Sequence, residues 1–207
     1  MEEARSPKRR SAETRNRIVS AAHELFVVRG YAGTTFQLVA DAAEVSVQTV
    51  YFHYGTKSEL LKHVVDVASA GDDEPVPLLG RPWFAALQAT EDPVKVVEGW
   101  VHASGVILDR VAPVLAVVRD AAAGDAGMAA QWAANSRERH TAHGTVVAIL
   151  ARLDALRPGL TERRATDITV GILSPDLFLV MRRECGWTTP QWEEWAADQL
   201  SHGLLAP

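Results

Sequence analysis

Apolar residues recur every three to four positions along most of this chain, which is the spacing of one face of an α-helix. No Asn-Gly or Asp-Gly pair lies between runs of alternating apolar and polar residues, so the usual signal of a β-hairpin is missing. The chain has 207 residues, of which 47% are hydrophobic and 23% charged, so it can bury a core. We therefore expect an all-α fold.

The cysteine count and the apolar runs restrict where such a protein can work. Cys185 is the single cysteine, which excludes an internal disulfide and a zinc site built from thiolates. The longest apolar run, Val111–Val118, is far shorter than the roughly 20 residues that span a membrane. The first residues lack the apolar stretch of a signal peptide. We expect a cytoplasmic protein with no membrane partner and no cofactor.

A linker divides the chain into two predicted domains. Residues 69–80 concentrate proline, glycine and acidic residues, which is typical of a linker. We therefore predict an N-terminal domain of residues 1–68 and a larger helical domain of residues 69–207. The whole chain has a formal charge of −5, but residues 1–64 contain nine Lys and Arg against seven Asp and Glu. The acidic total therefore does not exclude a nucleic-acid partner for the N-terminal domain.

Helix start and stop signals divide the N-terminal domain into four helices. They follow a basic arm of residues 1–10, which either reaches DNA or is a solvated tail. The signals are Gly30 as a C-cap, Thr35 and Ser46 as N-caps, and a capping box from Thr56 to Glu59. The predicted helices are one that ends at Gly30, then Phe36–Ala43, Val47–Tyr54 and one that begins after Thr56.

The second and third helices are joined by only Glu44 and Val45, so they must cross steeply. This is the shape of a helix-turn-helix, whose second helix enters the major groove of DNA. The third helix is crowded with aromatic and hydrogen-bonding side chains. Only Val50, with Val45 and part of Tyr54, is free to fill a core. The alternative, on periodicity alone, is an aromatic-rich core helix.

A family resemblance is carried by the segment TTFQLVADAAEVSVQTVYFHYGTKSELL at residues 34–61. This segment resembles the DNA-binding part of the tetracycline-repressor-like (TetR) family of bacterial regulators. The segment RIVSAAHELF at residues 17–26 is similar to the family's first helix. Two departures lie at the turn and just after it, where Glu44 and Gln48 stand at positions that often hold glycine or proline. The resemblance implies a helix-turn-helix transcription regulator with a helical C-terminal domain for ligand binding and dimerisation.

Side-chain chemistry and the family pattern together assign the DNA contacts. Gln48 can offer a bidentate amide to adenine, which is worth about 1–3 kcal/mol of discrimination. Val47 and Phe52 suit a thymine methyl group, and Tyr51 can reach a base or a phosphate. Phosphate contacts are expected from Thr35, Thr49 and His53. Lys57 lies in the first turn of the fourth helix, where backbone N–H groups would bind the same phosphate. The predicted DNA-binding residues are Thr35, Val47, Gln48, Thr49, Tyr51, Phe52, His53 and Lys57; the alternative for each is an ordinary surface or capping residue.

The C-terminal domain contains polar and aromatic side chains that could line a ligand pocket between helices. The resemblance implies such a pocket and leaves the ligand open. The predicted contacts to a small apolar or aromatic effector are Trp100, His102, Trp132, His140 and His143. Any of these Trp residues could instead be core. His140 and His143 have a helical spacing compatible with a metal, but they lack an acidic or thiolate partner, so no metal site is predicted.

Periodicity in the C-terminal domain predicts helices at about residues 93–109, 112–122, 126–155, 162–183 and 189–204. The last two keep one apolar face. The resemblance implies that the last long helices dimerise as a four-helix bundle, with an interface of Leu173, Leu177, Val180, Trp192, Trp195 and Leu200. The alternative is that these faces close the core of the single chain.

These observations predict a homodimeric, ligand-responsive DNA-binding transcription regulator, and a repressor in preference to an activator. Two copies of the third helix would read successive major grooves of a palindromic operator, about 34–36 Å apart. One alternative is a small helical enzyme that uses His102, His140, His143 or Cys185. The sequence contains no Ser/His/Asp set, phosphate loop or carboxylate pair that supports it, so no catalytic residue is predicted. The other is a regulator without an effector, whose C-terminal domain only dimerises.

Overall fold

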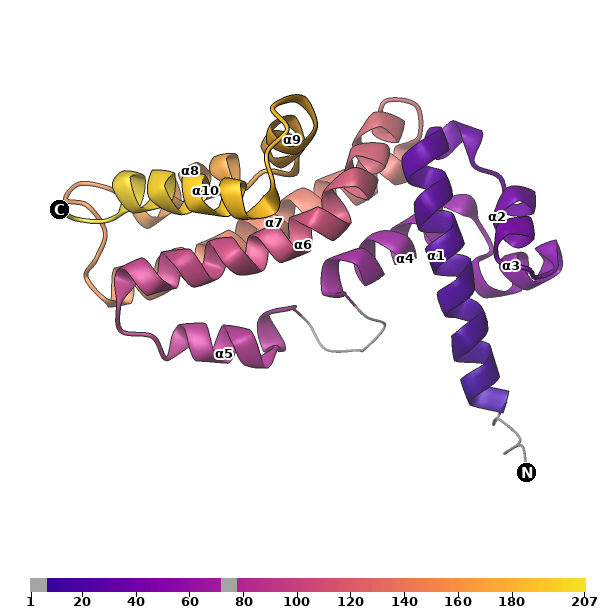
Figure 1. Cartoon of the computed structure of the whole chain (residues 1–207), viewed down its shortest axis with the longest axis horizontal. Helices are drawn as coiled ribbons and strands as arrows, with labels where there is room; N and C mark the ends of the chain where they lie inside the picture. Colours follow the sequence, from indigo (N-terminus) through magenta and orange to yellow (C-terminus); the bar gives the residue numbers. More distant parts are fainter. Residues whose placement is uncertain (1–6, 72–77) are drawn as a thin grey trace. The chain divides into compact units, whose positions relative to one another are not determined.

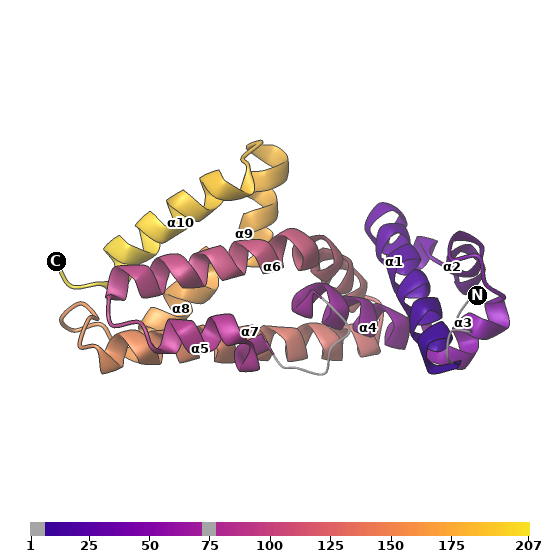
Figure 2. The same ribbon diagram turned by 60° about the horizontal axis from the view of Figure 1, so that its bottom comes forward.

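A computed structural model describes residues 7–71 and 78–207, with the architecture shown in Figures 1 and 2. These residues are mostly helical, and the one strand-type pairing among them is an antiparallel bridge between Leu156 and Leu205. The predicted all-α fold is therefore confirmed. Residues 1–6 of the predicted basic arm, and the middle of the predicted linker, lie outside the described residues.

Contacts group the described chain into two compact units. The first unit contains the residues up to Val67 together with Val114–Trp132. The second contains the residues from Ala68 to Pro113 together with Ala133–Pro207. The N-terminal helices therefore share their unit with a segment that comes much later in the sequence.

The N-terminal helices are α1 (Pro7–Gly33), α2 (Phe36–Ala42), α3 (Val47–Tyr54) and α4 (Lys57–Ala70). The predicted bounds of the second and third helices are confirmed to within one residue. Gly30 interrupts α1 with φ 69°, so the predicted C-cap position is a real break in the helix. The prediction of an arm up to residue 10 is wrong from Pro7 onward, because proline is tolerated in the first turn of a helix and α1 begins there.

The remaining elements are η1 (Leu78–Gly80), α5 (Pro82–Gln88), α6 (Pro93–Ala122), α7 (Ala126–Arg152), α8 (Glu162–Ile172), α9 (Pro175–Leu179), the π-helical turn η2 (Val180–Glu184) and α10 (Thr189–Leu204). The predicted helices at 126–155 and 189–204 are confirmed as α7 and α10, although α7 ends three residues early. α5 lies where no helix was predicted.

Two predicted helix boundaries in this part are wrong. The expected break between residues 109 and 112 does not occur. α6 continues through it and through Pro113, with Val111, Ala112, Val114 and Leu115 all buried. Burial on both sides of Pro113 offsets the backbone hydrogen bond that proline cannot make. Conversely, the expected helix at 162–183 is broken after Ile172, where α8 ends. Ser174 starts α9 there by accepting a hydrogen bond from the Leu177 N–H group at 3.2 Å.

Among the described helices, α6 is the single one whose length and apolar composition would suffice to cross a membrane. Half of its most apolar stretch is buried within the protein. The core helix of a soluble protein has the same length and composition, so this property by itself is weak evidence for a membrane span.

Candidate DNA-binding surface

The turn between α2 and α3 has a defined backbone geometry. Glu44 adopts φ 53°, a left-handed conformation that favours glycine. The Val45 N–H group donates to the Ala40 carbonyl at 3.0 Å. Ser46 then caps α3 by accepting from the Thr49 N–H group at 3.2 Å. These contacts set the angle at which α3 leaves α2.

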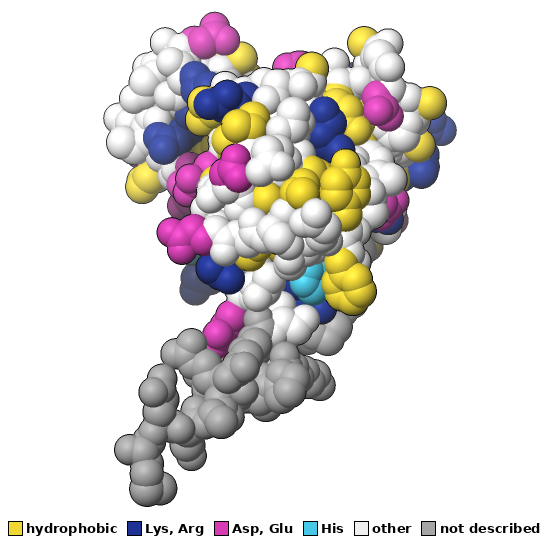
Figure 3. Space-filling view, turned by 90° about the vertical axis from the view of Figure 1, so that its right-hand side faces the viewer, with side chains coloured by type: hydrophobic (Ala, Val, Ile, Leu, Met, Phe, Trp, Pro, Cys, Tyr) yellow, Lys and Arg dark blue, Asp and Glu magenta, His cyan; other side chains and the backbone are white. Residues whose placement is uncertain are grey.

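α3 buries one residue and exposes its aromatic side chains. Val50 is fully buried, as predicted, whereas Tyr51 is 56% exposed and Phe52 is 86% exposed. The Tyr51 ring packs edge-on against Phe36 of α2, with 4.6 Å between ring centroids, so it is held in place while it stays accessible. This exposure rules out an aromatic-rich core helix. Figure 3 shows the side of the molecule on which α2 and α3 lie in Figure 1, where hydrophobic side chains have both basic and acidic side chains beside them.

The other predicted base contacts, Gln48 and Val47, also reach the surface: Gln48 is exposed and Val47 is half-buried. Among the predicted phosphate contacts, Thr35 is exposed and caps α2 by accepting from the Leu38 N–H group at 3.2 Å. Thr49 and His53 are half-buried. Burial, and then the charge of Arg15, lowers the pKa of His53, so its imidazole is a neutral hydrogen-bonding group at pH 7.

Lys57 begins α4 as predicted, but its ammonium group already has partners. Its Nζ atom donates to the backbone carbonyl of Tyr31 at 2.7 Å and lies 4.3 Å from the centroid of the Tyr31 ring. An ammonium group has three N–H donors, so this arrangement leaves capacity for a phosphate oxygen. The sequence analysis missed Tyr31, and the available signal was its position directly after the helix break at Gly30.

The predicted effector contacts do not form one group. Trp100 and His143 are buried and bonded to each other, with the Trp100 indole N–H group donating to His143 Nδ1 at 3.1 Å. Burial lowers the pKa of His143 to about 4, so this imidazole is neutral at pH 7. By contrast, His102 and His140 are exposed, and Trp132 is half-buried in the other compact unit.

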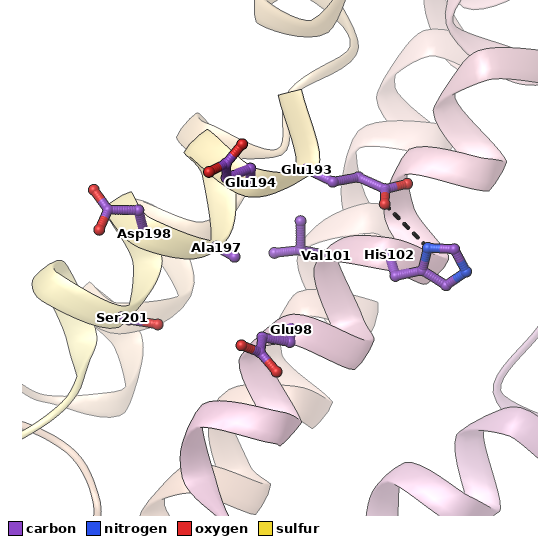
Figure 4. Close-up of a pocket in the computed structure, with 8 residues that line it drawn as sticks. All are labelled: Glu98, Val101, His102, Glu193, Glu194, Ala197, Asp198 and Ser201. Carbon is purple, nitrogen blue, oxygen red and sulfur yellow. Dashed lines mark hydrogen bonds and ion pairs between the residues drawn. The ribbon is translucent and has the colours of Figure 1, made fainter. Parts of the chain in front are cut away.

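The exposed histidines pair with carboxylates. His102 lies 3.1 Å from Glu193, and His140 lies 3.2 Å from Asp167. His102 also lines a groove of about 510 Å³ between α6 and α10, drawn in Figure 4. The groove is acidic, and its lining residues are Glu98, Val101, His102, Glu193, Glu194, Ala197, Asp198 and Ser201. In the described part of the chain, no group of three or more His, Cys, Asp or Glu residues is placed to hold a metal ion.

The predicted dimer residues divide into two sets. Leu173, Trp192 and Leu200 are at most 2% exposed, so they fill the core of the single chain and do not present their side chains to a second copy. Trp192 packs edge-on against Phe178, with 4.9 Å between ring centroids. The other three keep accessible surface: Leu177 and Trp195 are half-buried and Val180 is 39% exposed.

A family model described as "Bacterial regulatory proteins, tetR family" matches residues 18–64. Among curated proteins, the chain is 34% identical over 84 residues to the regulator TtgR of Pseudomonas putida, which is 36% of this chain and 40% of TtgR. It is also 34% identical over 98 residues to the uncharacterised regulator TtgW of the same species, which is 44% of this chain and 70% of TtgW. The match to TtgR thus spans well under half of that protein.

Solved structures match over nearly the whole chain. A SmeT–triclosan complex superposes with a TM-score of 0.72 and 20% identity, covering 93% of this chain and 91% of SmeT. NalD, a secondary repressor of a multidrug efflux pump in Pseudomonas aeruginosa, superposes with a TM-score of 0.68 and 18% identity, covering 94% of this chain and 98% of NalD. At these identities the superpositions concern the fold.

Proposed function

Since the chain belongs to the tetR family of bacterial regulatory proteins, we propose that it regulates transcription by binding double-stranded DNA through α2 and α3. The observation that carries the proposal is the accessible aromatic face of α3, with Phe52 86% exposed on a helix whose start is capped and packed on α2. Residues 1–68 serve as the DNA-binding domain, and residues 69–207 bind an effector and a second copy. The protein acts in the cytoplasm, where its DNA is.

In the proposed complex, α3 enters the major groove and its first turn reads bases. Gln48 contacts an adenine, while Val47 and Phe52 contact thymine methyl groups. Tyr51 contacts a base or a phosphate. The remaining predicted residues, Thr35, Thr49, His53 and Lys57, hold the DNA backbone and so set the register of α3.

A homodimer fits the proposed function, because two DNA-binding domains about 34–36 Å apart match successive major grooves of a palindromic operator. The surface residues Leu177, Val180 and Trp195 are the part of the predicted interface that a second copy can contact. A small apolar or aromatic effector that binds near Trp100 and His143 would change the distance between the two DNA-binding domains. A coupling free energy of about 1–3 kcal/mol between effector and DNA binding would alter DNA affinity roughly 5–150-fold. The triclosan-bound SmeT supports this effector class.

Selection of bound duplexes from a random pool tests the proposal. We expect the purified protein to enrich one palindromic sequence and to bind it as a dimer, with an affinity that falls as the salt concentration rises. Fluorescence anisotropy at two salt concentrations measures that dependence. Failure to enrich any sequence, at a protein concentration where the dimer forms, would contradict the proposed function.

Replacing Gln48 with alanine should relax the sequence preference at one base pair in each half-site. The lost amide removes about 1–3 kcal/mol of discrimination at that position while the other contacts remain. Repeating the selection with the variant measures this change. The control is Gln88→Ala, which removes an exposed glutamine side chain at the end of α5. An unchanged consensus for Gln48→Ala would show that Gln48 reads no base.

Replacing Lys57 with alanine should instead weaken binding to all duplexes alike. Because one phosphate contact is lost, the plot of log affinity against log salt should flatten by about one unit. Salt titrations of the selected operator and of an unrelated duplex measure both effects. Lys95→Ala, which removes an exposed charge at the start of α6, is the matched control. A slope equal to that of the unmodified protein would remove Lys57 from the contact set.

A further inference from the structure

Tyr31 holds the Lys57 side chain through two separate contacts. The Lys57 ammonium group donates to the Tyr31 carbonyl at 2.7 Å, and it also lies 4.3 Å from the centroid of the Tyr31 ring. A hydrogen bond limits where the nitrogen atom can lie, and the ring attracts the cation from a second direction. The long, flexible lysine side chain is therefore ordered before any DNA arrives.

The chain is built to place Tyr31 at this point. Gly30 has φ 69° and ψ −179°, a conformation that side chains disfavour, and it turns the backbone out of the regular helix just before Tyr31. A Cβ atom at Gly30 would meet no atom within 4 Å, so the glycine serves the backbone conformation and not a close approach. The buried Thr34 hydroxyl then donates to the Gly30 carbonyl at 2.9 Å, which closes the turn.

The Tyr31 hydroxyl connects α1 to the start of α7, within the same compact unit. It donates to Asp125 Oδ2 at 3.3 Å. The other carboxylate oxygen of Asp125, Oδ1, accepts from the Met128 N–H group at 3.0 Å and so caps the start of α7. Burial, and then the charge of Asp125, raises the pKa of Tyr31, while a hydrogen bond with Ser58 acts in the opposite direction. The hydroxyl thus stays protonated and can donate at pH 7.

We propose that Tyr31 and Asp125 are positioning residues for DNA binding: Asp125 at the start of α7 orients Tyr31, and Tyr31 presents the Lys57 ammonium group to a DNA phosphate. This inference rests on the proposed function. Neither residue touches DNA in this proposal, and Asp125 lies 94 positions from Tyr31 in sequence. α7 is a single helix, and its residues beyond Trp132 belong to the second unit. A shift of the first turn of α7 would move Asp125 and so change its hydrogen bond with Tyr31.

The test removes the hydrogen bond from either side. Tyr31→Phe keeps the ring and the backbone carbonyl but loses the hydroxyl. Asp125→Asn keeps one oxygen to cap α7 but replaces the oxygen that accepts from Tyr31 with an NH2 group, which cannot accept. Each variant should bind the selected operator about five- to tenfold more weakly, with a salt slope that flattens towards that of Lys57→Ala. The double variant should be no weaker than Tyr31→Phe alone, because Tyr31→Phe already removes the hydrogen bond to Asp125.

Two further variants separate positioning from loss of structure. Asp120→Asn removes the same charge from an exposed side chain near the end of α6 and should leave affinity and slope unchanged. In a Lys57→Ala background, Tyr31→Phe should have no additional effect on DNA binding. A merely structural role would lower the fraction of active protein and leave the salt slope as it was.

The outcomes distinguish this inference from the proposed function. If the unmodified protein selects an operator but Tyr31→Phe binds it with unchanged affinity and slope, the positioning role is wrong and the proposed function stands. If Tyr31→Phe weakens binding equally with and without Lys57, the role is also wrong, because the effect does not pass through Lys57. If the unmodified protein selects no duplex, the proposed function and this inference both fail.

Discussion

Replacing Trp192 with alanine should lower the free energy of unfolding by about 3–5 kcal/mol, the usual cost of deleting a large buried aromatic side chain. Trp192 is fully buried in α10 and packs against Phe178 of α9. Because these contacts lie within one chain, the loss should be the same at low and high protein concentration. Urea unfolding of the unmodified protein and the variant, followed by circular dichroism at two concentrations, measures it.

Trp195→Ala is the control for this prediction. Trp195 lies three positions further along α10, is half-buried, and contacts Trp187 at 5.9 Å between ring centroids. Its removal should cost less unfolding free energy and should weaken dimerisation, as measured by sedimentation. If instead Trp192→Ala dissociated a dimer without destabilising the monomer, the burial of Trp192 within its own chain could not be its main role.

Lowering the pH from 6.5 to 4 should cost about 3 kcal/mol of stability through His143 alone. Burial lowers the pKa of His143 from 6.5 to about 4 in the folded state. Between these values the unfolded chain binds a proton at His143 and the folded chain does not, so stability falls as the solution becomes more acidic. Below about pH 4 both states are protonated, and this contribution falls no further.

Comparison with His143→Gln isolates this contribution. Glutamine stays neutral throughout and its amide oxygen can still accept from the Trp100 indole N–H group. The unfolding free energy of this variant, followed by urea titration from pH 4 to 7, should therefore vary less with pH than that of the unmodified protein. Equal pH profiles for His143→Gln and the unmodified protein would contradict the low pKa.

Local signals sufficed for the N-terminal helices. The bounds of α3 follow from the cap at Ser46 and from the start signal of the next helix at Thr56, because both signals lie close beside the segment that they delimit. The exposure of Tyr51 and Phe52 was also predictable, since only Val50, with Val45 and part of Tyr54, was free to fill a core. Short helices with strong caps depend little on the rest of the chain.

Features that depend on distant residues were not predictable in this way. The predicted break between residues 109 and 112 is absent, because α6 stays continuous where the apolar residues Val111, Ala112, Val114 and Leu115 are buried. An apolar face on α10 is equally compatible with the core of one chain and with a dimer interface. Trp192 belongs to the core, because it is buried against Phe178 of the same chain. Likewise, no local pattern relates Tyr31 to Asp125, which lies in a different part of the sequence.

The composition of the first compact unit bears on how regulators of this kind can be recombined. A chimera joined at residue 68 would transfer α1 to α3 and most of α4 but leave behind Val114–Trp132, and with it the carboxylate that Tyr31 binds. Grafting both stretches together keeps that bond intact. To exchange operator specificity between relatives, a chimera should therefore carry two segments from the same parent, with junctions after Val67, Pro113 and Trp132.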